Sequence, residues 1–142
     1  MNCYIRAATP EDIDAMHAIR LAVRENPFSK ASGITTHTYE PYVSSASAWV
    51  AERNHAIVGF AAVDEANAEV WALFVAASDE MTGVGRALHD AILGWATGRG
   101  LVQLELATTP NTRAEGFYKK LGWRPVGYDV HGQILFRLSI SR

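Results

Sequence analysis

The sequence predicts an α/β fold in one domain spanning residues 1–142, built on a mixed, twisted sheet of about seven strands with helices on both faces. Two observations lead to this prediction. Strand-like runs alternate with helix-like patterns, and the strand–helix–strand unit from Val70 to Leu106 has the layout of a right-handed parallel crossover. Segments that resemble hairpins lie on either side of this unit, so antiparallel strands are expected to flank the parallel pair.

The N-terminal part predicts a strand, a helix and a long connecting segment. The run CYIRAA is typical of a short strand. The next helix is expected to have Thr9 as its N-cap and Pro10 as its first residue, because these residue types favour those positions. Residues 26–48 mix Pro, Gly, Ser and Thr with aromatic residues, so we expect a loop with one short helix around Tyr39–Ser45.

The middle of the chain predicts the central strands and a long helix. WVAERNHAIVGFAAV is expected to form a hairpin that turns at Asn54 and His55. EVWALFV is too apolar for an edge strand and is expected to be central. The helix that follows carries a continuous apolar stripe, and Gly98 and Gly100 mark its end.

The C-terminal part predicts a strand, a helix and a closing hairpin. LVQLELAT is the strand, and NTRAEGFYKKLG is the helix. Asn111 or Thr112 is expected to cap this helix, Glu115 to complete a capping box with Thr112, and Gly122 to end it. WRPVGYDV and QILFRLSI are expected to pair around a turn at His131.

Composition and charge narrow the classes of partner. Fifteen acidic and thirteen basic side chains give a formal charge of −2 with no basic run, so nucleic acid is not expected as a partner. No apolar run is long enough to cross a membrane, and the N-terminus lacks a signal pattern. The single cysteine, Cys3, cannot form an internal disulfide and is expected to be a small buried residue, so a cytoplasmic location is expected.

The stretch DEMTGVGRALHD places Gly83 and Gly85 at a helix start, where exposed N–H groups form an anion site. However, Asp79 and Glu80 would repel a phosphate. Arg86 follows the second glycine where a P-loop needs lysine, and leucine replaces the third glycine of a dinucleotide fingerprint. On the glycines alone, a plain turn into a helix explains the stretch equally well.

Two longer stretches, LFVAASDEMTGVGRALHDAIL and LELATTPNTRAEGFYKKLGW, together resemble the GNAT (Gcn5-related N-acetyltransferase) superfamily, and the resemblance covers nearly the whole chain. The family motif Gln/Arg-x-x-Gly-x-Gly/Ala is matched by residues 80–85. A later family motif is matched by Asn111, the Phe117–Tyr118 pair and the Leu-Gly-Trp that follows. The resemblance implies an N-acetyltransferase that moves an acetyl group from acetyl-CoA to a primary amine by direct attack in a ternary complex.

The resemblance also implies how the co-substrate is held. Main-chain N–H groups of the glycine loop would bind the diphosphate of acetyl-CoA, the pantetheine arm would pair with the end of the strand EVWALFV, and no metal would be needed. Glu80 stands where relatives usually carry Gln or Arg, and Thr82 where a basic residue is common, so Arg86 and Arg113 are candidate compensating charges. The implied cofactor-binding residues are Phe74, Val75, Thr82, Gly83, Val84, Gly85, Arg86, Asn111, Arg113 and Tyr118.

The resemblance assigns the proton transfers to two residues. Tyr118 would donate a proton to the departing thiolate, because a phenol stays neutral at working pH. Glu69 would accept the proton of the amine through water, with Glu105 and His37 as alternatives and Glu105 equally explained as a partner for an arginine. Strand alternation places Glu69, Trp71 and Leu73 on one face unless a bulge intervenes.

The acceptor pocket would be built from the first helix with its segment RLAVREN, the following loop and the final hairpin. Its expected residues are Arg24, Tyr39, Tyr42 and Trp71, with Glu25, Phe28, His37 and Tyr128 nearby. This set suits a small polar amine or an amino-acid-like acceptor. Open alternatives are a peptide N-terminus as acceptor, an acyl group other than acetyl, a non-catalytic acyl-CoA-binding or regulatory module, and a structural domain without ligand. A homodimer is compatible with the C-terminal surfaces.

Overall fold

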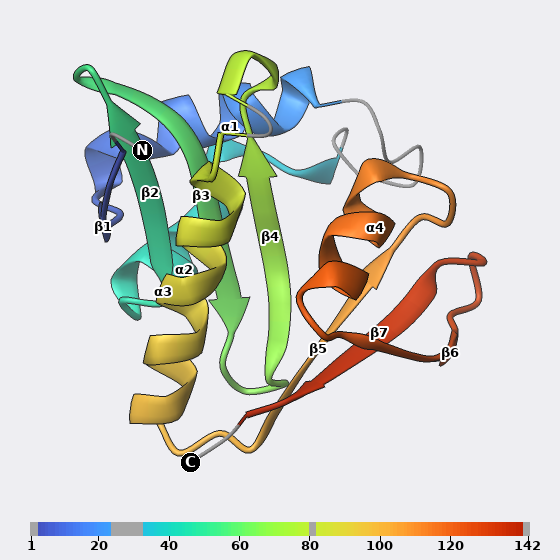
Figure 1. The fold of residues 1–142 in the computed structure, drawn as a ribbon. Coiled ribbons are helices and arrows are strands. Elements are labelled where there is room, and N and C mark those ends of the chain that lie inside the picture. The colour runs from blue at the N-terminus through green and yellow to red at the C-terminus, as the bar shows by residue number, and fades with distance from the viewer. Residues whose placement is uncertain (1–2, 24–32, 80–81, 141–142) are drawn as a thin grey trace.

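The structure, a computed structural model, describes residues 3–23, 33–79 and 82–140. Within these ranges the strands are β1 Tyr4–Ala7, β2 Ala48–Arg53, β3 Ala56–Asp64, β4 Glu69–Val75, β5 Gln103–Thr108, β6 Arg124–Tyr128 and β7 Ile134–Ser139. They form one sheet in the order β1-β2-β3-β4-β5-β7-β6 (Figure 1). The pair β4–β5 is parallel and the other neighbouring pairs are antiparallel, which confirms the predicted mixed sheet of seven strands.

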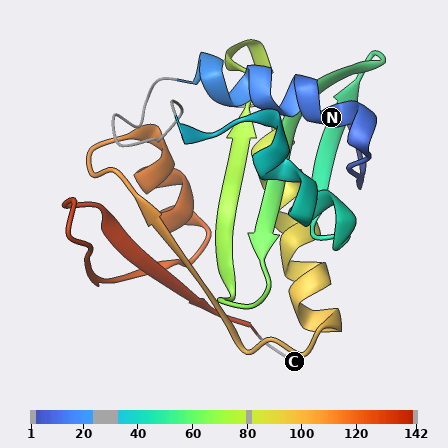
Figure 2. The same ribbon diagram turned by 180° about the vertical axis from the view of Figure 1, so that it is seen from behind.

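Helices cover both faces of the sheet, as predicted (Figures 1 and 2). They are α1 Ile13–Ala22, α2 Glu40–Ser44, α3 Val84–Gly98 and α4 Arg113–Lys120, with the short 3₁₀ turns η1 Pro10–Asp12, η3 Thr36–Tyr39 and η4 Ala77–Asp79. Helices α3 and α4 lie on one face, and α1 and α2 lie on the other. Among the described residues, no helix is long and apolar enough to span a membrane.

The sheet separates two apolar cores. The first lies under α3, whose Val84, Leu88 and Ile92 are fully buried. The second lies under α1 and contains Met16 and Phe60, which are also fully buried. Because burial of one such side chain contributes roughly 1.5–3 kcal/mol, the two cores hold α1 and α3 firmly against opposite faces of β3 and β4.

A bulge in β4 changes which of its side chains share a face. The β3–β4 register shifts between Ala62 and Val63, and Trp71 is left without a partner on β3. Trp71 therefore packs into the core under α1, whereas Leu73 packs into the core under α3. Glu69 faces the same way as Trp71, because its neighbour Val70 is buried under α3. The bulge that the prediction allowed for is therefore present, and the residue that it adds moves Leu73 to the opposite face.

The parallel contact between β4 and β5 is short. Their register contains one pair, Glu69 with Glu105, and the strands separate beyond it (Figure 1). On its other side β4 stays paired with β3 as far as Val75. In the part of the chain that the structure describes, no strand lies beside the β5-facing edge of β4 from Trp71 to Val75. Such an edge presents N–H and C=O groups that an extended ligand can bind.

Thr9 is the N-cap and Pro10 the first helical residue, as predicted, but the first turn is the 3₁₀ turn η1, and the α-helix begins at Ile13. Asp12 explains this start, because its carboxylate accepts hydrogen bonds from Thr9 N–H at 2.8 Å and from Arg6 Nη1 and Nη2 at 2.8 and 2.9 Å. Arg6 Nε also donates to Glu52 on β2 at 2.8 Å. The hydrogen bonds from Arg6 hold the pKa of Asp12 below its ordinary value.

Other predicted ends of elements are confirmed. Asn54 and His55 form the β2–β3 turn with left-handed φ values of 54° and 67°. Thr112 caps α4 by accepting the N–H of Glu115 at 3.3 Å. The Glu115 carboxylate accepts the N–H of Asn111 at 2.6 Å, so the returning bond of the predicted capping box is shifted by one residue.

Replacing Asp12 with Asn should lower the free energy of unfolding at neutral pH by about 2 kcal/mol, because charge-assisted hydrogen bonds to Arg6 are lost. The folded-state pKa of Asp12 is depressed, so its carboxylate stabilises the fold above the unfolded pKa of about 3.9, and this stabilisation disappears as pH falls through the folded-state pKa. Urea unfolding at about pH 7 and about pH 3 measures the difference, which should shrink at the lower pH. Glu11→Gln is the matched control, because Glu11 is exposed. A loss of equal size at both pH values would contradict the explanation.

Candidate active site

The N-terminus of α3 presents main-chain N–H groups that have no acceptor within the helix. Gly83 is the N-cap, with a φ of 92° that glycine adopts at little cost. Ala87 N–H donates to Gly83 O at 3.0 Å, so the N–H groups of Val84, Gly85 and Arg86 precede the first helical bond. Because a glycine cap has no side-chain acceptor, these donors are open to an anionic ligand.

Arg53, at the end of β2, neutralises the acidic start of this loop. Its Nη1 donates to Asp79 Oδ1 at 2.5 Å and to Thr82 Oγ1 at 3.3 Å, and both charged side chains are largely buried. The carboxylate expected to repel a phosphate is therefore paired with a cation. The sequence alone does not single out Arg53, because 26 residues separate it from Asp79. The other acidic residue of the loop, Glu80, lies outside the described residues.

Phe117 connects α4 to the start of α3. A Cβ atom at Gly85 would lie 3.4 Å from Phe117 Cε1 and Cζ and 3.6 Å from Val75 Cγ2, so glycine lets the ring pack against the helix start. This contact places the helix that carries Tyr118 beside the end of β4. Gly83 is thus favoured by its left-handed backbone conformation, whereas a Cβ at Gly85 would come into close van der Waals contact with Phe117 and Val75.

Tyr118 lies on the inner face of α4 and is 7% exposed. Its ring packs edge-on against Phe117 and Trp123, with centroids 5.1 and 5.6 Å apart. Burial raises the pKa of the Tyr118 phenol above its ordinary value, so the phenol is protonated at neutral pH. A neutral O–H donor is therefore available on this helix, and its role as an acid stays a prediction.

The remaining residues expected to hold the co-substrate lie around these helix starts. Phe74 and Val75 end β4. Asn111 is exposed just before α4 and has a left-handed φ of 65°. Arg86 and Arg113 are exposed in the first turns of α3 and α4. Their positions at two helix N-termini are compatible with a shared anion, and their contacts with a ligand stay predictions.

Three carboxylates lie side by side where β4 begins. Asp64 on β3 pairs with Glu69, and Glu69 pairs with Glu105 on β5. Arg137 Nε and Nη2 donate to Glu105 Oε2 at 2.9 and 2.6 Å, which confirms the alternative that Glu105 is a partner for an arginine. Glu69 is exposed at the surface, yet partial desolvation of its carboxylate raises its pKa, and the charges of Asp64 and Glu105 raise this pKa further. A carboxylate of raised pKa is a stronger base once it is ionised.

His37 and Tyr128 lie at the surface. His37 is exposed on η3, with its Nδ1 3.0 Å from Glu40 Oε2. An exposed histidine paired with a neighbouring carboxylate has the ordinary features of a surface residue, and nothing in its surroundings marks it as the base. Tyr128 is exposed on β6.

Three of the four residues predicted to bind the acceptor are described. Tyr42 and Trp71 stack with their ring centroids 4.5 Å apart, and burial raises the pKa of Tyr42. Tyr39 is fully buried, with its ring edge-on to Trp71 and its hydroxyl 3.0 Å from His17 Nδ1. In this structure Tyr39 supports Trp71 from below the surface, and its contact with an acceptor stays a prediction. Outside the described residues lie Arg24, Glu25 and Phe28.

Arg20, in the last turn of α1, contacts the same aromatic residues. Its Cζ lies 4.7 Å from the ring centroid of Trp71 and 4.9 Å from that of Phe74. The residue is 8% exposed, and burial lowers the pKa of its guanidinium. The sequence prediction included its segment in the pocket without singling it out. A signal did exist, because Arg20 follows Met16 by four residues and so falls on the apolar face of the helix.

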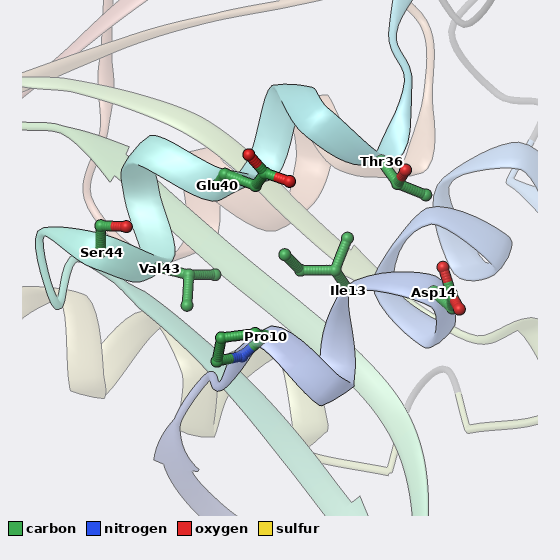
Figure 3. Close-up of a pocket in the computed structure, with 7 residues that line it drawn as sticks. All are labelled: Pro10, Ile13, Asp14, Thr36, Glu40, Val43 and Ser44. Atoms are coloured by element: carbon green, nitrogen blue, oxygen red, sulfur yellow. The ribbon is translucent and has the colours of Figure 1, made fainter.

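Two surface hollows lie on the α1–α2 side of the sheet. The larger, of about 360 Å³, lies between the start of α1 and the segment η3–α2, and none of the predicted site residues lines it (Figure 3). Its lining residues are Pro10, Ile13, Asp14, Thr36, Glu40, Val43 and Ser44. The second, of about 280 Å³, is bordered by Tyr42 and Asp64. Only the second adjoins the residues around Glu69, so the larger hollow is not the candidate site.

Solved structures show the same fold at low sequence identity. Ard1 from Thermoplasma volcanium has 19% identity and a TM-score of 0.84, with all of both chains covered. PaiA N-acetyltransferase from Thermoplasma acidophilum, in complex with coenzyme A, has 15% identity and a TM-score of 0.79, covering 98% of this chain and 99% of that one. The ribosomal-protein-S18-alanine N-acetyltransferase from Escherichia coli has 19% identity and a TM-score of 0.77, covering 99% and 95%.

The sequence comparisons give the family. No curated protein matches the chain. The family model described as the acetyltransferase (GNAT) family matches residues 13–123, which include the glycine loop, helices α3 and α4, and the motif around Tyr118. The chain therefore belongs to the GNAT family of acetyl-CoA-dependent N-acetyltransferases.

Proposed function

We propose that this protein transfers an acetyl group from acetyl-CoA to the primary amine of a small-molecule or amino-acid-like acceptor, by direct attack in a ternary complex. The observation that carries the proposal is the unpaired edge of β4 beside the open N-terminus of α3. A long ligand with an anionic end and amide groups along its arm matches this combination, because the helix start binds the anion and the strand edge binds the amides.

The donor site uses main-chain groups more than side chains. N–H groups from Thr82 to Arg86 would hold the diphosphate, and the backbone of Phe74 and Val75 would pair with the pantetheine arm. The pairing of Asp79 with Arg53 removes the negative charge that would oppose binding. The exposed Asn111 and the cationic Arg86 and Arg113 border the same region and would add to the hold on the ligand. These contacts need no metal.

The chemistry requires two proton movements. When bound, acetyl-CoA supplies a thioester, whose C–S bond breaks as the amine nitrogen forms a bond to the carbonyl carbon. Glu69 would accept the proton of the amine through water, which its raised pKa favours. Tyr118 would donate to the departing sulfur, and its raised pKa keeps the proton on the phenol until that moment. No covalent enzyme intermediate is required.

Isothermal titration with acetyl-CoA, followed by a panel of amines with thiol release as the readout, tests the function. We expect micromolar binding with competition by CoA. Arg53→Gln should weaken acetyl-CoA binding about fivefold, because it removes the cation that offsets the charge of the Asp79 carboxylate near the diphosphate. Asp79→Asn in the same chain should restore the affinity, and Arg99→Gln, an exposed arginine paired with Glu65, is the matched control. Absence of binding in the wild-type protein would overturn the proposal.

Replacing Tyr118 with Phe should lower kcat about 100-fold, because the departing thiolate loses its proton donor. The affinity for acetyl-CoA should stay within about twofold, since the ring packing is kept. Stopped thiol-release assays and a parallel titration separate the two effects. Tyr4→Phe, at an exposed tyrosine on β1, is the control. An unchanged kcat would remove Tyr118 from the proposed role.

Replacing Glu69 with Gln should lower kcat/KM about 100-fold and abolish the acidic limb of its pH profile. The carboxylate must be ionised to accept a proton, so wild-type activity should rise as pH increases through the raised pKa of Glu69. Glu105→Gln is the informative comparison, because removal of its charge lowers the pKa of Glu69 and should move the limb to lower pH without abolishing it. If the limb persists unchanged in Glu69→Gln, the base is another group.

A further inference from the structure

Arg20 is a buried cation without an ionic partner among the described residues. Its Nε and Nη1 atoms are buried there and meet no hydrogen-bond acceptor. In contrast, Arg6, Arg53 and Arg137 each donate to a carboxylate within 2.9 Å. Buried arginines are normally paired, because desolvated N–H donors without acceptors are unfavourable. Arg20 thus differs from these three arginines in having no carboxylate partner among the described residues.

Aromatic rings surround the guanidinium, which also interacts with the Tyr39 hydroxyl, but its buried Nε and Nη1 donors have no acceptor among the described residues. The faces of Trp71 and Phe74 attract the positive charge. The N–H groups, however, lie in the guanidinium plane and need an acceptor at its edge. Burial lowers the pKa of Arg20, so the surroundings as they stand disfavour the charged form. An apolar side chain would fill the same space without this penalty. Packing alone therefore does not explain why a charged residue occupies position 20.

The position of Arg20 suggests a reason. It contacts Trp71, the bulge residue of β4 that faces the acceptor side together with Glu69. Tyr42 stacks on Trp71 and borders the 280 Å³ hollow next to Asp64. The stacked rings of Trp71 and Tyr42 therefore extend from the guanidinium of Arg20 toward the carboxylates at the start of β4.

We propose that Arg20 binds the carboxylate of an acceptor that carries both a primary amine and a carboxylate, with the amine presented toward Glu69. This inference rests on the proposed function. The two oxygens of a carboxylate suit the donors of a guanidinium edge. The acidic row at the start of β4 repels the carboxylate and attracts the ammonium group, so the two charged ends fix the orientation. The N-terminal residue of a peptide lacks a carboxylate on its main chain and would leave Arg20 unpaired.

The test compares free L-amino acids with the matching L-amino acid amides as acceptors, with acetyl-CoA as donor and thiol release as the readout. With the wild-type protein, kcat/KM for each free amino acid that is accepted as a substrate should exceed kcat/KM for its amide by about tenfold or more. Arg20→Gln should raise the KM of the acids about tenfold and change that of the amides less than about twofold. Arg20→Lys should fall between, because it keeps the charge but not the bidentate geometry. Arg99→Gln should leave the acid-to-amide ratio unchanged.

The outcomes separate this inference from the proposed function. Equal losses for acids and amides in Arg20→Gln, together with a lower melting temperature, would overturn it in favour of a structural role. A peptide acceptor would be favoured, and the inference overturned, by two results together. Alanine-rich tripeptides would be acetylated faster than the free amino acids, and Arg20→Gln would not change their rate. If no amine is acetylated, the proposed function fails. In that case the inference about Arg20 is tested by titrating the same acids and amides into the CoA-loaded protein. Binding that is selective for the acids and is lost in Arg20→Gln supports the inference, and a lack of such selective binding overturns it.

Discussion

β4 and β5 are paired only at Glu69 and Glu105, and the places of the candidate catalytic groups follow from this short parallel contact. The crossover through α3 requires the two strands to be parallel, so α3 begins beyond the end of β4 and α4 beyond the end of β5. Because the strands separate from the contact onward, the backbone N–H and C=O groups near their carboxyl ends do not form hydrogen bonds with one another. The glycine cap of α3 and the helix that carries Tyr118 flank the edge left open, which is where α/β sheets commonly bind ligands.

The bulge at Trp71 determines which side chains of β4 lie on each face of the sheet. Beyond the bulge, Leu73 and Val75 face α3 and α4, the side on which the starts of both helices lie. Before it, Glu69 faces the opposite side, and Trp71 itself packs there under α1. A donor lying along the strand edge can therefore be approached by an acceptor from the other face. This geometry favours direct attack, since neither substrate has to leave before the other enters.

The parts that sequence predicts well are those whose signal is local. The seven strands, the turn at Asn54 and His55 and the cap at Thr112 follow from residues within a few positions of each other. The bulge that separates Leu73 from Glu69 does not, because the register is set by β3 and not by β4 alone. The pairing of Arg53 with Asp79 joins residues far apart in the sequence. The depth at which Tyr39 lies is likewise decided by tertiary packing around it, which no local pattern encodes.

Two carboxylates near the site are paired with arginines, and two other charges are not. At the glycine loop Asp79 is paired with Arg53, and at the contact between β4 and β5 Glu105 is paired with Arg137. On the acceptor face Glu69 has carboxylates as neighbours in both strands, and the buried Arg20 has none among the described residues. Each unmatched charge is costly to desolvate, and the cost falls when a ligand group of opposite sign arrives. The proposed acceptor, with its ammonium group near Glu69 and its carboxylate at Arg20, would supply a partner of opposite sign to each of these charges.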